Sequence, residues 1–168
     1  MAILLSLQGA IGQGILWGIM ALGIYLTFRI LDIADLSVDG SFATGGAVCA
    51  VALVAGVHPL VAIILATLAG FLAGFITGFL HTKCQMPAIL AGILTQLALY
   101  SINLRIMGKS NIPLLQSSTL FKDLANVIPL TSQWITICIG LVFSFIVVAG
   151  IYWFLGTEFG SCLRATGN

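Results

Sequence analysis

Carboxylates and hydroxyls gather in a short segment, residues 30–41, that follows one apolar stretch and runs into another. Asp32 opens this cluster, whose members stand among Ile, Leu and Val residues. A carboxylate is costly at the depth of the lipid hydrocarbon, so such a segment is expected to be broken or re-entrant, interfacial or open to a water-filled cavity. A broken membrane helix can present carboxylates and backbone groups to the amino group of a solute. The residues of this segment predicted to line a solute path are Asp35, Ser37, Asp39 and Ser41.

The same carboxylates also have an ordinary structural interpretation. Asp39 can accept the first free backbone N–H groups of a helix that follows it, as N-cap residues do. Asp32 and Asp35 can equally be exposed to solvent near Arg29. The sequence leaves both interpretations open, a helix cap and a place on the solute path.

A second set of polar side chains interrupts the apolar stretch at residues 88–106. Gln96, Tyr100 and Asn103 are spaced i, i+4 and i+7, so they share one face of a helix. This face is predicted to point into the same solute path. The alternative is interhelical hydrogen bonding, which stabilises membrane bundles by about 0.6 kcal/mol per bond on average.

The amino-acid composition indicates which kind of structure holds these polar residues in place. Of 168 residues, 60% are hydrophobic and only 7% are charged, and the mean hydropathy is +1.18. A water-soluble domain carries about 25% charged residues, so that class is excluded. A net charge of +1 offers no basic stripe for nucleic acid. About 20 apolar residues are needed to cross a bilayer as a helix. We therefore predict an all-α polytopic transmembrane bundle that forms one domain over residues 1–168. It has about five spans, at residues 9–28, 42–57, 59–80, 88–106 and 133–155.

Glycines mark one face of the predicted span at residues 59–80. Gly70, Gly74 and Gly78 are spaced i, i+4 and i+8. A row of positions without side chains lets another helix approach closely, as in small-xxx-small packing. We therefore predict that these three glycines form a helix-packing ridge.

No pattern predicts catalysis or a metal site. The 4 cysteines lie far apart without a C-x-x-C or Cys/His spacing, so they are expected to be free thiols. His58 and His81 are isolated beside turns. The chain also lacks the G-x-x-x-x-G-K-[ST] phosphate loop, so no cofactor is expected on it and energy from ATP must come from a partner.

Three segments carry a resemblance to a known family. The sequence DLSVDGSF at 35–42, the stretch 81–115 and the tail EFGSCLRATGN at 158–168 resemble membrane subunits of ATP-binding-cassette importers. The similarity is to the branched-chain amino acid and sugar permease superfamily, and within it to the subgroup for amino acids such as tryptophan and tyrosine. The resemblance implies a permease of the bacterial cell (inner) membrane that moves a small polar solute. A secondary transporter or a channel-like bundle without an ATPase is the alternative.

The resemblance also implies partners. Members dimerise and bind an ATP-binding subunit and an external solute-binding lipoprotein, so a homodimer in the lipid bilayer is expected. Members are longer, and this chain resembles their N-terminal part. Residues 156–168 would be the cytoplasmic coupling segment, which puts the loop at 81–87 on the same side and 108–132 outside. The residues implied to contact the ATPase are Glu158, Gly160, Leu163, Arg164, Ala165, Thr166 and Gly167.

Overall fold

The computed structural model describes residues 2–114, 119 and 132–166, and all regular structure in them is helical. It contains 5 helices that are long and apolar enough to cross a membrane: Ser6–Ile30, Ser37–Val54, Pro59–Thr82, Ala88–Met107 and Thr136–Leu155. The expected all-α polytopic bundle is confirmed. The chain divides into two compact units, residues 1–32 with 121–168, and residues 33–120, which are described separately. That residues 1–168 act as one transmembrane domain stays a prediction.

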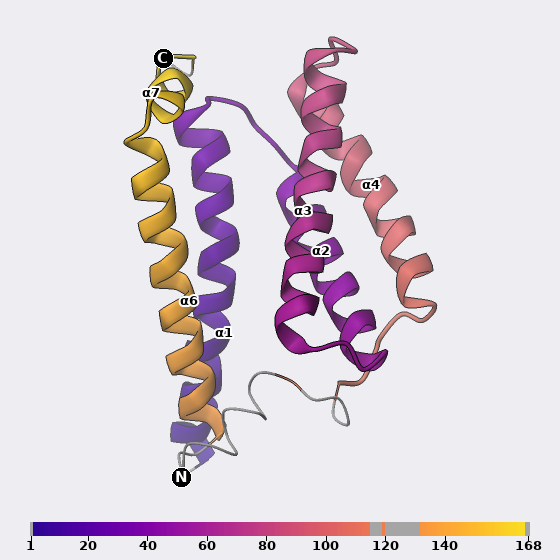
Figure 1. The fold of residues 1–168 in the computed structure, drawn as a ribbon, viewed down its shortest axis with the longest axis vertical. Helices are drawn as coiled ribbons and strands as arrows, with labels where there is room; N and C mark the ends of the chain where they lie inside the picture. The colour runs from indigo at the N-terminus through magenta and orange to yellow at the C-terminus, as the bar shows by residue number, and fades with distance from the viewer. Residues whose placement is uncertain (1, 115–118, 120–131, 167–168) are drawn as a thin grey trace. The chain divides into compact units, whose positions relative to one another are not determined.

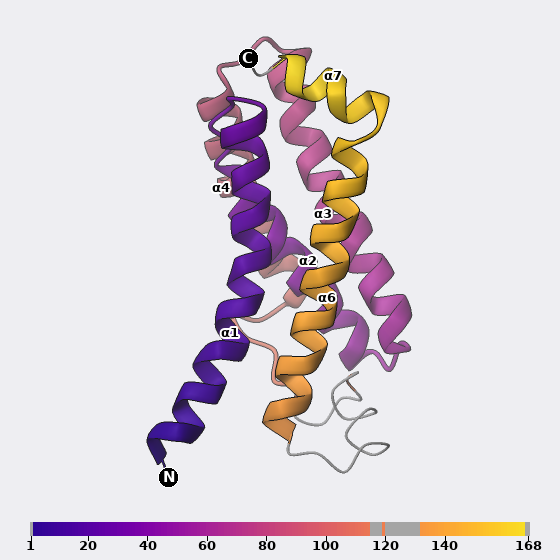
Figure 2. The same cartoon turned by 90° about the vertical axis from the view of Figure 1, so that its left-hand side faces the viewer.

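The first unit combines the beginning and the end of the chain. It contains α1 (Ala2–Tyr25), the π-helix η1 (Leu26–Ile30), α6 (Ser132–Leu155) and α7 (Glu158–Thr166). Helices α1 and α6 pack side by side and run in the same direction (Figures 1 and 2). The end of α1 and the short helix α7 therefore lie at the same end of this unit.

Glycines permit the contact between α1 and α6. A Cβ at Gly12 would lie 3.7 Å from Cγ1 of Ile137, and one at Gly140 would lie 3.4 Å from Cγ2 of Ile15. Both glycines are buried. Small residues at a helix interface let backbones approach, and packing contacts between helices then replace contacts with lipid.

The second unit is a three-helix bundle of α2 (Ser37–Val54), α3 (Pro59–Thr82) and α4 (Ala88–Met107). Helix α2 packs against both α3 and α4 (Figure 1). Pro59 begins α3, where its missing N–H is not needed, and the His58 Nδ1 atom accepts the N–H of Leu60 at 3.3 Å. Helix α4 ends at Gly108, whose φ of 63° suits a left-handed C-cap.

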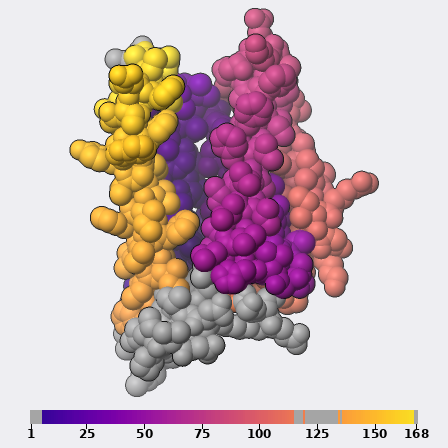
Figure 3. All heavy atoms as spheres, in the orientation of Figure 1, coloured from indigo at the N-terminus to yellow at the C-terminus, as the bar shows by residue number. Residues whose placement is uncertain are grey.

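The buried positions are mostly small, and the large apolar side chains face outward. Ala62 and Ala91 are fully buried, whereas Phe71 and Phe75 are 68% and 61% exposed. Large side chains also stand out from the surfaces of α4 and α6 (Figure 3). This distribution suits a lipid environment, in which outward apolar groups need no cover and small residues set the helix spacing.

The expected break near residues 30–41 is present but shorter than predicted. Residues 31–36 form no helix, and Asp32 adopts a left-handed backbone with a φ of 53°. Helix α2 already begins at Ser37, so the predicted span at 42–57 starts and ends too late. The π-helix η1, immediately before the break, was not expected. A π-turn is commonly a single-turn insertion within an α-helix, which hydropathy does not reveal.

Candidate functional site in the second unit

The carboxylate of Asp35 organises the start of α2. Its Oδ1 atom accepts the backbone N–H of Ser37 at 2.8 Å, and Ser37 is only 1% exposed. This is the local turn that Asp side chains form with the backbone two residues on. Asp39 lies inside the first turn of α2 instead of before the helix. The interpretation of Asp39 as the helix cap is therefore wrong, because Asp35 binds a first free N–H.

Glycines bring α4 against the start of α2. A Cβ at Gly92 would lie 2.8 Å from the backbone nitrogen of Leu36, closer than real Cβ atoms come to other atoms. On α2, a Cβ at Gly40 would lie 3.2 Å from Cα of Gln96. Neither glycine was among the predicted site residues. An isolated glycine inside a helical pattern is the signal that indicates such a close approach.

A pocket of about 320 Å³ opens between α2 and α4. Gln96 lines it beside Asp39, and its Nε2 atom donates to Asp39 Oδ2 across the two helices at 3.5 Å. The residues around the pocket are Asp39, Gly40, Ala43, Ile93, Gln96, Leu97, Tyr100 and Asn103. The predicted polar face of α4 and one of the predicted carboxylates thus meet in one cavity.

The other predicted path residues have local partners and do not line this pocket. Asp35 and Ser37 are joined in the turn described above. Ser41 donates its hydroxyl to the carbonyl of Val38 at 2.9 Å. A place for these residues on a solute path stays a prediction.

Asn103 gives the pocket an unused acceptor. The residue is 7% exposed, and its buried Oδ1 atom has no hydrogen-bond partner among the described residues. A buried polar atom without a partner costs about 1–3 kcal/mol. A hydrogen-bond donor of a molecule bound in the pocket would pair with Asn103 Oδ1 and remove this cost. Tyr100 also lines the pocket, but it is 68% exposed.

The pocket combines acceptors and donors of hydrogen bonds between apolar walls. Asp39 and Asn103 offer a carboxylate and a carbonyl oxygen, while Gln96 and Tyr100 offer an amide and a hydroxyl. Few polar groups placed in a largely apolar cavity are typical of small-molecule sites. This set can accept bonds from an ammonium group and donate bonds to a carboxylate.

Helix α7, the predicted coupling segment, is fixed to the end of α6. The Thr157 hydroxyl donates to the Phe154 carbonyl at 2.6 Å and accepts the N–H of Gly160 at 3.4 Å. A Cβ at Gly160 would collide with the Phe154 carbonyl oxygen and lie 2.5 Å from Cα of Leu155. Only glycine fits there, so α7 can turn sharply from the axis of α6 (Figure 2).

The two faces of α7 differ. Gly160 is buried, and Leu163 lines an apolar groove within the first unit. Phe159 was not among the predicted residues, but at 78% exposure it is a large apolar side chain without cover. The other exposed residues of α7 that were predicted to meet an ATPase are Glu158, Arg164, Ala165 and Thr166. Gly167 lies outside the described residues, and contact of any of them with an ATPase stays a prediction.

The glycine ridge on α3 meets a neighbour at one position. A Cβ at Gly70 would lie 3.6 Å from the carbonyl oxygen of Ser41 in α2. At Gly74 and Gly78, a Cβ would meet nothing within 4 Å in the part of the chain that the structure describes. Packing at these two positions against a further helix stays a prediction.

The cysteines are not among the residues that line the polar pocket. Cys49, Cys84, Cys138 and Cys162 are free. No group of three or more His, Cys, Asp or Glu residues that could hold a metal ion occurs among the described residues.

These features define a multi-pass membrane protein with a small polar pocket between its helices. Residues 6–168 match the family described as branched-chain amino acid transport system / permease component. The chain belongs to this family. Its place is the bacterial cell (inner) membrane.

Curated relatives cover nearly the whole chain. It is 43% identical over 156 residues to the tyrosine transport system permease protein of Clostridioides difficile (strain R20291), an alignment that covers 93% of this chain and 50% of the relative. It is 37% identical over 160 residues to an uncharacterized protein of Rickettsia prowazekii (strain Madrid E), covering 94% of this chain and 53% of the relative. The chain spans about half the length of these relatives. No solved structure matches it.

Proposed function

We propose that this chain is part of the permease subunit of an ATP-binding-cassette importer, and that its α2–α4 pocket lies on the path of an amino acid. The observation that carries the proposal is the meeting of Asp39, Gln96, Tyr100 and Asn103 in one cavity of a membrane bundle. Membership of a permease family supports the same assignment. Polar groups inside a membrane bundle are expensive, so their concentration at one pocket favours a functional role.

An amino acid matches the chemistry of the pocket. Its ammonium group can donate to the Asp39 carboxylate and the unpaired Asn103 oxygen. Its carboxylate can accept from the Gln96 amide and the Tyr100 hydroxyl. The name of the Clostridioides difficile relative makes tyrosine the first solute to test.

The partners follow from the class of importer. An ATP-binding subunit would hold ATP, since this chain has no phosphate loop, and would contact the exposed face of α7 that carries Glu158 and Phe159. An external solute-binding lipoprotein would deliver the amino acid. A second permease copy would complete the pathway, with lipid around both.

The proposed mechanism is alternating access. Closure of the ATP-binding subunits on ATP would move α7, which packs closely against the end of α6 at Gly160 and is joined to Thr157 by a hydrogen bond. The movement of α6 would change which side of the membrane wets the pathway. A ligand that binds the two states unequally shifts their populations, so the solute and ATP act on one equilibrium.

The test is uptake of radiolabelled tyrosine by cells that carry the native locus of this chain and by cells in which the locus is deleted. A strain with an inactivated ATP-binding subunit is the third arm. Tyrosine uptake that is lost when the locus of this chain is deleted, and also when the ATP-binding subunit is inactivated, supports the proposal. Uptake that requires this chain but not the ATPase, and that a protonophore abolishes, contradicts it and supports a secondary transporter.

A further inference from the structure

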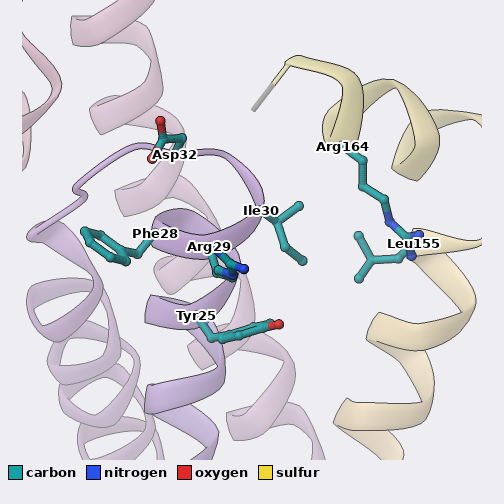
Figure 4. Close-up of a pocket in the computed structure, with 7 residues that line it drawn as sticks. All are labelled: Tyr25, Phe28, Arg29, Ile30, Asp32, Leu155 and Arg164. Carbon is teal, nitrogen blue, oxygen red and sulfur yellow. The ribbon is translucent and has the colours of Figure 1, made fainter. Parts of the chain in front are cut away.

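A second polar pocket lies in the first unit, between the end of α1 and the α6–α7 corner. Its volume is about 690 Å³, and Arg29 and Arg164 both line it. Figure 4 shows Arg164 descending from α7 beside Leu155, while Tyr25 directs its hydroxyl from the last turn of α1 toward the same space. The chain has only 6 Lys and Arg residues in total. Two of them, far apart in sequence, therefore converge on one pocket.

Neither guanidinium is neutralised by a close partner. Among the described residues, Arg29 and Arg164 have no ion pair or hydrogen bond. Asp32 also lines the pocket but forms no such bond with them. Two arginines and one aspartate leave one positive charge, so the pocket is complementary to a group with one negative charge.

An apolar groove of about 380 Å³ adjoins this pocket. Ile30 and Leu155 line both cavities, so the groove begins beside the pocket. The groove follows α6 through Val147, Gly150 and Ile151. A Cβ at Gly150 would meet no atom within 4 Å in the described part of the chain, which leaves this stretch of α6 open.

The position of the pocket corresponds to the membrane interface. Arg29 lies at the end of the first candidate span, Ser6–Ile30, and Arg164 follows the last one, Thr136–Leu155. The groove runs back along the apolar span from there. Tyr25 is 56% exposed at the same level, where aromatic residues commonly sit near lipid headgroups.

We propose that this site binds an anionic phospholipid, with its phosphate between Arg29 and Arg164 and an acyl chain in the α6 groove. Arginine pairs with phosphate through two parallel N–H donors, and basic pockets beside membrane helices recognise anionic headgroups. A singly charged headgroup with hydroxyls, such as phosphatidylglycerol, balances the remaining positive charge and can donate to Asp32. Bound lipid would join α1 to α7 at the end of the first unit.

The experiment measures the binding of spin-labelled phosphatidylglycerol relative to phosphatidylcholine. The full native protein that contains this chain is reconstituted in phosphatidylcholine vesicles, and the motionally restricted lipid is quantified by electron paramagnetic resonance. The test variant is R29Q/R164Q, and R105Q/K109Q removes the same charge from exposed residues outside the pocket. R29K/R164K keeps both positive charges but lacks the paired N–H donors of arginine, and it serves as the test variant if R29Q/R164Q folds poorly.

An exposed arginine near an anionic surface contributes about fivefold in affinity. R29Q/R164Q removes two such contributions and should therefore lower the preference for phosphatidylglycerol about 25-fold. R105Q/K109Q should largely preserve the preference, and R29K/R164K should show an intermediate loss, because lysine keeps the charge but not the paired N–H donors. An unchanged preference in R29Q/R164Q, or an equal loss in both charge-removing variants, would overturn the proposal.

Filling the groove separates a lipid from a free anion. Gly150→Leu places a side chain in the groove but leaves both arginines, so it should weaken phosphatidylglycerol binding and leave phosphatidylcholine unaffected. Inorganic phosphate at millimolar concentration should not displace the labelled lipid. Displacement by phosphate together with unchanged lipid binding in Gly150→Leu would assign the pocket to a free phosphate ion instead.

Discussion

Gly92 of α4 lies against the backbone of Leu36, so that a Cβ at position 92 would come within 2.8 Å of the Leu36 nitrogen. The same Cβ would lie 3.2 Å from Oδ1 of Asp35, the atom that accepts the N–H of Ser37. A side chain at position 92 would therefore disturb the turn that precedes α2.

Gly92→Ala should destabilise the protein. An added methyl group in a closely packed site costs about 1–3 kcal/mol, because the backbone must shift. Thermal unfolding in detergent measures the loss. Gly46→Ala is the control, since a Cβ there would meet nothing within 4 Å in the described residues and alanine favours a helix. Equal unfolding temperatures for the two variants would contradict the close contact.

The role of Asp35 should be to accept the N–H of Ser37 in the turn before α2, so its negative charge should matter little for stability. Asp35→Asn keeps an oxygen for the N–H of Ser37 and should unfold close to the native temperature. Asp35→Ala loses the bond and should cost about 1 kcal/mol, the usual penalty for removing a helix-start acceptor. If asparagine and alanine destabilise equally, the charge of Asp35 matters and the turn does not explain its role.

The exposed face of α7 should contact the ATP-binding subunit. A cysteine introduced as Glu158→Cys, in a background without other cysteines, is expected to cross-link to that subunit in the full complex. Leu141→Cys, at an exposed position in the middle of α6, should not cross-link to the ATP-binding subunit. Cross-linking at 141 alone, or at neither position, would contradict the proposed coupling role of α7.

The glycine ridge on α3 should matter for assembly more than for the fold of the unit. Gly74→Leu meets open space in the described residues, so the unfolding temperature should change little. The added side chain should nevertheless reduce dimer formation, measured by native gel electrophoresis, if a further helix packs there. Leu68→Ala is the matched control on the same span. Normal assembly of Gly74→Leu would place this ridge against lipid.

The membrane spans could be predicted because hydropathy is a local property of the chain. The shared face of Gln96, Tyr100 and Asn103 was also predictable, since helical spacing alone places them together, and the structure gives them one pocket. The residue at which α2 starts could not be predicted. The turn before it packs against Gly92 of α4, and a tertiary contact of this kind leaves only an isolated glycine in the sequence.

The convergence of Arg29 and Arg164 could not be predicted for a similar reason. Each is an ordinary charge at the end of an apolar stretch. They line one pocket because α1 and α6 run in the same direction and α7 turns at Gly160. Parallel packing of the first and last spans is a property of the folded unit, and hydrophobic periodicity carries no information about it.

The central claim is that the α2–α4 pocket lies on the path of an amino acid, and Asp39→Asn tests it most directly. The measurement is the initial rate of ATP-dependent tyrosine uptake by cells with equal membrane levels of each variant, with Ser101→Ala, at an exposed α4 position outside the pocket, as control. Loss of a charged acceptor for the ammonium group should lower the rate about tenfold, and Ser101→Ala should transport normally. Native rates in Asp39→Asn would contradict the claim.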